Sequence, residues 1–95
     1  MINMKRLEEV NTDLKKIRYY YKNYSALKNV ESLSSLVAKY YNVISLAPAE
    51  LVTYYVYYYQ HNFCNKVVAD KMSLSLSYIT KISSYLKIYL SQNLI

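Results

Sequence analysis

The stretch VADKMSLS, residues 68–75, contains the end of one predicted helix, a short turn and the start of another. The first of these helices covers residues 65–72 and has a small residue, Ala69, at its centre. Ser75 is the predicted N-cap of the second, because a serine hydroxyl accepts an N–H bond that a helix start leaves free. Beyond it, apolar residues recur with the spacing of one helical face at Ile79, Ile82, Leu86 and Leu90. With Leu74 as an apolar plug in the turn, these are the parts of a helix-turn-helix.

Three further helices are predicted ahead of this pair. Apolar residues in the first segment follow a heptad spacing, at Leu7, Val10, Leu14, Ile17, Tyr21 and Tyr24. This stripe is either a dimer seam or the face that packs on the rest of the chain. The spacing loses phase within residues 23–31, where a break is expected with Asn29 as a cap, and a second helix runs to about Ile44. Pro48 is predicted at the first position of a third helix that ends near residues 60–62, because that position needs no backbone N–H.

The composition of the 95 residues also favours helices. There is no glycine and only one proline, whereas β-rich folds usually place glycine in their many tight turns. We therefore predict an all-α fold, a small domain of about five helices with a C-terminal helix-turn-helix. Residues 1–46 supply packing helices and a candidate surface for a homodimer, and residues 47–95 hold the helix-turn-helix unit. Because a chain this short has material for one core, both parts are expected to form one compact domain.

The chain carries a net charge of +6, and its basic residues gather at the two ends. Residues 1–30 hold seven lysines and arginines against three acidic residues, and residues 61–95 hold four lysines against one aspartate. Basic ends suit a polyanion, most often nucleic acid, and would also suit an anionic membrane surface. The single cysteine, Cys64, and the lack of a signal peptide or a long apolar run indicate a cytoplasmic location and no membrane partner.

The sequence around the turn resembles a known family. The residues that carry the resemblance are Tyr58, Tyr59, residues 68–75, Ile79 and Lys81. Over residues 46–92 they resemble region 4 of bacterial sigma factors and, more closely, the small phage-encoded transcriptional activators of the ArpU/RinA type. The resemblance implies a sigma-like DNA-binding transcriptional regulator encoded by a phage or prophage. The sequence departs from the family at Ser73, where many relatives have glycine, and in a last helix that has no arginine.

Helical geometry identifies the residues that can touch DNA. With the apolar stripe of the last helix buried, the first turns of its opposite face would enter the major groove of double-stranded DNA. The predicted contacts from this helix are Ser75, Ser77, Tyr78, Thr80, Lys81 and Ser84. Lys81 can reach guanine or phosphate, and Tyr78 can bond a phosphate through its hydroxyl. Lys66 and Lys71 occupy positions from which helix-turn-helix proteins hold the DNA backbone.

The predicted reading face is sparse, because it has none of the Arg, Asn and Gln side chains that favour bidentate base recognition. We therefore expect modest sequence specificity, with dimerisation or contact with RNA polymerase supplying the rest. Tyr85 and Ile88 on the outward side of the same helix also suit a protein partner. Two alternative functions follow: a helical protein-binding module, such as an anti-repressor or RNA-polymerase adaptor, and a phage packaging or assembly factor that forms a ring. A basic amphipathic membrane-surface peptide is a more distant alternative.

Sequence features of an enzyme or a metalloprotein are missing. His61 and Cys64 lack further ligands at zinc spacing. No glycine-rich loop is present to bind a nucleotide phosphate. Glu8, Glu9 and Asp13 lie among basic residues on a predicted exposed helix and are interpreted as surface pairs. We therefore expect no enzymatic activity, no cofactor and no metal.

Overall fold

The computed structural model describes residues 4–94, and every regular element in that range is helical. The elements are α1 (Met4–Lys22), α2 (Tyr24–Leu27), α3 (Glu31–Ile44), α4 (Ala49–Tyr55), the π-helical turn η1 (Val56–Gln60), α5 (Asn65–Met72) and α6 (Leu76–Asn93). Since η1 continues α4 directly and α2 is a single turn, the described residues form five main helices, namely α1, α3, α4 with η1, α5 and α6. The predicted all-α domain of about five helices is confirmed.

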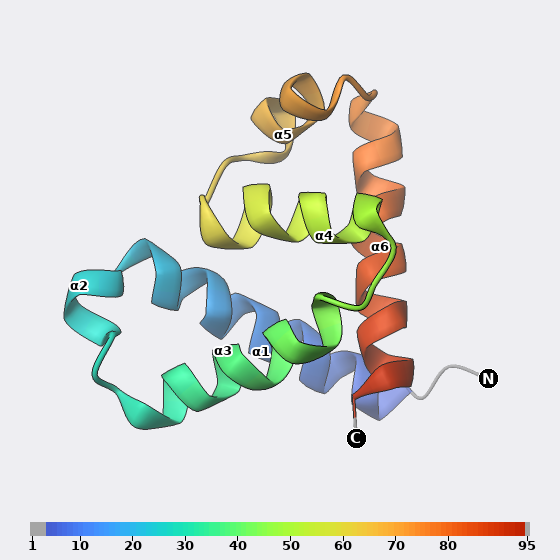
Figure 1. The fold of residues 1–95 in the computed structure, drawn as a ribbon. Coiled ribbons are helices and arrows are strands. Elements are labelled where there is room, and N and C mark those ends of the chain that lie inside the picture. The colour runs from blue at the N-terminus through green and yellow to red at the C-terminus, as the bar shows by residue number, and fades with distance from the viewer. Residues whose placement is uncertain (1–3, 95) are drawn as a thin grey trace.

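Helix α6 is the element around which the others are arranged (Figure 1). It is contacted by α1, α3, α4 and α5. In Figure 1 it runs along one side of the molecule, with α5 at its N-terminal end and α1 and α3 towards its C-terminal end. Helix α1 also contacts α3 and η1. The N-terminal and C-terminal halves of the chain therefore share one core.

Two predicted apolar stripes contribute to that core. Ile79, Ile82, Leu86 and Leu90 of α6 are fully buried, as predicted. Val10, Leu14 and Ile17 of α1 are buried to the same degree. Of the two interpretations of the heptad stripe, these residues therefore fit the second: they pack on the rest of their own chain.

Tyrosine contributes several further side chains to this core. Tyr40, Tyr54, Tyr55 and Tyr59 are buried. A tyrosine ring can lie in the core while its hydroxyl reaches a polar group at the edge. The Tyr40 hydroxyl donates a hydrogen bond to Asp13 Oδ2 at 2.7 Å, and the Tyr54 hydroxyl donates to Asn65 Oδ1 at 3.2 Å. Burial raises the pKa of Tyr40, Tyr55 and Tyr59 above the usual value of a phenol.

The end of α1 differs from its prediction. Tyr20 is buried, Tyr21 is half-buried and Tyr24 is exposed, whereas the heptad spacing placed Tyr21 and Tyr24 inside. The chain turns at Asn23, and the Tyr20 ring then packs edge-to-face against both other rings, with centroids 5.4 and 5.6 Å apart. The expected break is confirmed, and it moves the buried position by one residue.

Two helix starts are also shifted. The N-cap of α3 is Val30 instead of Asn29, and no side chain accepts a hydrogen bond there. Pro48 is the N-cap of α4 instead of its first residue, with ψ of 144°. Its carbonyl accepts hydrogen bonds from the N–H groups of Leu51 and Val52 at 2.9 and 3.2 Å. The helix therefore begins at Ala49, one residue later than predicted, with Pro48 directly before it.

The π-helical turn η1 has no counterpart in the sequence prediction. The His61 N–H donates to the Val56 carbonyl, five residues earlier, at 2.9 Å. Tyrosine rings stack on one another along α4 and this wider turn. The Tyr54 ring stacks on the Tyr58 ring with centroids 5.4 Å apart. Asn62 then takes a left-handed conformation with φ of 58°, after η1 has ended, and the chain continues into α5.

Candidate nucleic-acid interface

The turn between α5 and α6 is short and well bonded. Ser73 has φ of 57° and ψ of 42°, the left-handed conformation that glycine adopts most easily. The Leu74 N–H donates to the Ala69 carbonyl at 3.0 Å, which closes the end of α5. At the position where the sequence departs from the family it resembles, Ser73 thus adopts a left-handed conformation without a glycine.

Ser75 caps α6 as predicted. Its Oγ accepts a hydrogen bond from the Tyr78 N–H at 3.2 Å and lies 3.3 Å from Ser77 Oγ. The cap satisfies one of the N–H groups that a helix start leaves unpaired. The Ser75 side chain thus already has a structural partner at the site where a DNA contact is predicted.

The structure brings four of the predicted residues together on one exposed face of α6. These residues are Ser77, Thr80, Lys81 and Ser84. The Thr80 hydroxyl donates to the Leu76 carbonyl at 3.2 Å, and the Ser84 hydroxyl donates to the Thr80 carbonyl at 3.3 Å. Both hydroxyls still have free acceptor lone pairs. Lys81 forms no salt bridge within residues 4–94, so its ammonium group has its donors available.

Tyr78 lies at the edge of this face, beside an acidic residue. Its hydroxyl donates a hydrogen bond to Glu50 Oε1 at 3.1 Å. That bond, together with the nearby negative charge of Glu50, raises the pKa of Tyr78. The predicted bond from Tyr78 to a phosphate would require the Glu50 contact to break, and the carboxylate would repel the phosphate. The Tyr78 side is therefore the less favourable side of the face for DNA.

Lys66 and Lys71 do not share a side of α5. Lys66 is exposed in the first turn, and Lys71 lies five residues later, about 140° around the helix. The Lys71 ammonium sits 5.0 Å from the centroid of the Phe63 ring, in a cation–π contact. A single DNA backbone could meet one of these lysines more easily than both.

The sequence prediction missed Arg18, which fixes α1 against the segment that leads into α5. Its Nε donates to the Tyr58 carbonyl at 3.0 Å, and its Nη2 donates to the Asn62 and Phe63 carbonyls at 3.3 and 3.4 Å. The guanidinium also lies 4.2 Å from the centroid of the Tyr58 ring. Nothing near Arg18 in the sequence signals these contacts, since its partners lie 40 to 45 residues away.

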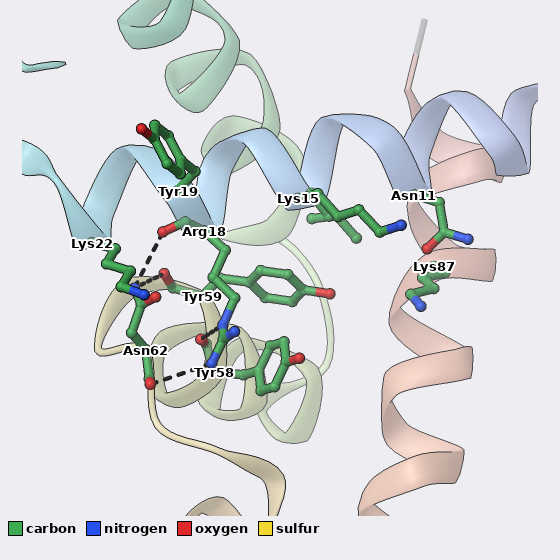
Figure 2. A pocket seen from close by; sticks show the side chains of 10 residues that line it. Asn11, Lys15, Arg18, Tyr19, Lys22, Tyr58, Tyr59, Asn62 and Lys87 are labelled. Carbon is green, nitrogen blue, oxygen red and sulfur yellow. Dashed lines mark hydrogen bonds between the residues drawn. The ribbon is translucent and has the colours of Figure 1, made fainter.

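Figure 2 shows that Arg18 is part of a basic groove between α1, η1 and α6, which the sequence prediction also missed.

No group of three His, Cys, Asp or Glu side chains within residues 4–94 could hold a metal ion. Cys64 is exposed, and the His61 ring stacks on Phe63 with centroids 5.5 Å apart. Over the same residues, no helix has the length and apolar character needed to cross a membrane.

Comparison with known proteins finds no family model that matches this chain, and no curated protein or solved structure similar to it.

Proposed function

We propose that this protein is a DNA-binding transcriptional regulator of the sigma-region-4-like kind found in phages and prophages, with α5 and α6 as its helix-turn-helix. The observation that carries the proposal is the pairing of a tight turn with a capped helix that has a polar outer face. Helix α6 contains two lysines, Lys81 and Lys87, and no acidic residue. A long helix with these features, set at a turn of three residues after a short helix, suits insertion into the major groove.

The exposed face of α6 would supply moderate affinity. Lys81 can contact a guanine edge or a phosphate, and the hydroxyls of Ser77 and Ser84 can contact either. No side chain on this face can form the bidentate contacts that discriminate most strongly between bases. A second copy of the chain or a contact with RNA polymerase would then complete the recognition.

The test is a fluorescence-anisotropy titration with a random duplex and with the native upstream duplex, at two salt concentrations. Binding should weaken steeply with salt, because phosphate contacts release counterions. Lys81→Glu should reduce the affinity at least tenfold and leave the circular dichroism spectrum unchanged, since Lys81 is exposed. Lys39→Glu on α3 is the control, because it makes the same charge change at an exposed position outside α6. Equal affinities for Lys81→Glu and the wild type would refute the assignment of this face.

A second candidate function is a protein-binding module, either an anti-repressor or an RNA-polymerase adaptor. The observation that favours it is a pair of exposed rings on one side of α6, where Tyr78 is 37% exposed and Tyr85, two turns later, is 52% exposed. The contact between Tyr78 and Glu50 also gives one side of α6 an acidic edge. Absence of binding to either duplex at low salt would favour this candidate. A ring-forming assembly factor would instead be revealed by a solution mass several times that of one 11.2 kDa chain.

A further inference from the structure

The basic groove lies on the side of the molecule where α1 crosses α6 and η1 (Figure 2). Its volume is about 430 Å³. Its lining residues are Asn11, Leu14, Lys15, Arg18, Tyr19, Lys22, Tyr58, Tyr59, Asn62 and Lys87. Four of these ten side chains are cationic and none is acidic. Such a concentration of one charge sign in a concave surface attracts and holds anions.

Helical spacing explains how the cations come together. Lys15, Arg18 and Lys22 are separated by three and four residues, so they share one side of α1. Lys87 faces them from α6. In Figure 2 the side chains of Lys15 and Lys87 lie towards one end of the groove, while Lys22 lies at the other end near Asn62. The positive groups are therefore distributed along the groove instead of being gathered at one point.

The positive charge of the groove is not neutralised by carboxylates. None of Lys15, Lys22 and Lys87 forms a salt bridge within residues 4–94. Arg18 donates hydrogen bonds to three backbone carbonyls, which orient the guanidinium but carry no net negative charge. A guanidinium held by carbonyls, together with three lysines that line the same groove, suits a ligand that has several phosphates in a row.

The groove adjoins the proposed reading face of α6. Polar residues follow one another along this helix at Thr80, Ser84 and Lys87, with spacings of four and three. Lys87 lies about 4.5 Å further along the helix axis than Ser84 and about 60° around it. One continuous polar strip therefore leads from the face that carries Lys81 into the groove.

We propose that the groove lined by Lys15, Lys22 and Lys87 binds the sugar–phosphate backbone of the DNA whose bases α6 contacts. The inference rests on the proposed function and extends it, because it assigns α1 a direct part in binding. Backbone contacts of this kind fix the register of the protein on the duplex and add affinity that does not depend on sequence. They would compensate for the sparse base-reading face of α6.

The experiment compares two triple variants in the same anisotropy titration. The first, Lys15→Gln/Lys22→Gln/Lys87→Gln, removes the groove lysines and leaves Arg18 in place to preserve the fold. The second, Lys16→Gln/Lys28→Gln/Lys39→Gln, removes three exposed lysines outside the groove and has the same net charge. Each variant is titrated with the random and native duplexes at several salt concentrations. A parallel sedimentation assay with phosphatidylserine vesicles tests an anionic surface as the ligand.

The groove variant should lose at least tenfold in affinity for both duplexes alike, and the slope of log K against log salt should become shallower by about 2 to 3. The control variant should lose much less. Equal losses in the two variants would show that net charge alone is responsible and would overturn the proposal. Groove-dependent binding to vesicles without binding to either duplex would also overturn it.

The same data separate this inference from the proposed function. If the wild type binds no duplex, both fail. If Lys81→Glu loses binding and the groove variant does not, the groove assignment fails and the reading face remains. If the groove variant loses binding and Lys81→Glu does not, α1 binds DNA and the reading face on α6 is wrong.

Discussion

Ser73 holds a left-handed backbone conformation without the help of glycine. A side chain with a Cβ pays about 1 kcal/mol or more for this conformation. Ser73→Gly should therefore raise the free energy of unfolding by about 0.5–1 kcal/mol, after allowance for the greater freedom of glycine in the unfolded chain. Urea denaturation followed by circular dichroism measures this change.

A matched control for Ser73→Gly is available in α3. Ser35 is exposed within a regular helix, so Ser35→Gly should lower the free energy of unfolding by roughly 0.5–1 kcal/mol. Opposite signs for the two variants would confirm that Ser73 is strained. A loss of stability in Ser73→Gly similar to that in Ser35→Gly would contradict the left-handed turn.

Among the elements, α1 depends on Arg18 for its position. Arg18→Gln removes three hydrogen bonds from a charged donor and the contact with the Tyr58 ring. The free energy of unfolding should fall by about 2 kcal/mol, because the carbonyls would lose a charged partner. Lys15→Gln, on the same side of α1 but exposed, should change stability by less than about 0.5 kcal/mol. Equal urea midpoints for Arg18→Gln and Lys15→Gln would show that Arg18 does not hold α1 in place.

The elements with strong local signals were predicted well from the sequence. Ser75 caps α6, and the apolar stripe of four residues that begins at Ile79 is buried. Both features were predictable because they depend on short-range spacing. The bounds of α5 agree with the prediction for the same reason. The shift from Tyr21 to Tyr20 was not predictable, since a tyrosine can lie in a core or at its edge. The π-helical turn has no residue signature in the sequence either.

The groove could not be predicted because its parts are distant in the sequence. Lys15 and Lys87 are brought together only when α1 lies across α6, and the spacing of residues within one helix contains no information about that crossing. From the basic ends of the chain, the sequence predicts only that the partner is a polyanion. The structure adds the location where charges from both ends meet.

For the molecule as a whole, the tyrosine core predicts a loss of stability at alkaline pH. Burial raises the pKa of Tyr40, Tyr55 and Tyr59 in the folded protein above the unfolded value of 10.0. The stabilisation is therefore fully present below pH 10 and is lost as the pH rises above 10, where the unfolded chain releases protons that the folded one retains. Urea denaturation between pH 8 and about 11.5 should show the free energy of unfolding falling by up to about 1.4 kcal/mol per pH unit for each tyrosine.

Single phenylalanine variants identify the source of that loss. Tyr59→Phe keeps a buried ring but has no proton to release, so its stability should fall less steeply above pH 10. Tyr19→Phe changes an exposed side chain and should follow the wild type. Identical pH profiles for all three proteins would show that Tyr59 is not a source of the loss.

The first and last parts of the described chain are in direct contact. Arg6 Nη1 donates a hydrogen bond to the Leu94 carbonyl at 2.6 Å, and Val10 lies in the same core as Leu90. On the ribosome, α1 is therefore synthesised long before α6, the helix that packs against the apolar side of α1. At roughly 5 to 20 residues per second, that interval lasts about 4 to 17 seconds. During each round of synthesis, an uncovered amphipathic helix must stay soluble or be held by a chaperone until translation reaches the last turns of α6.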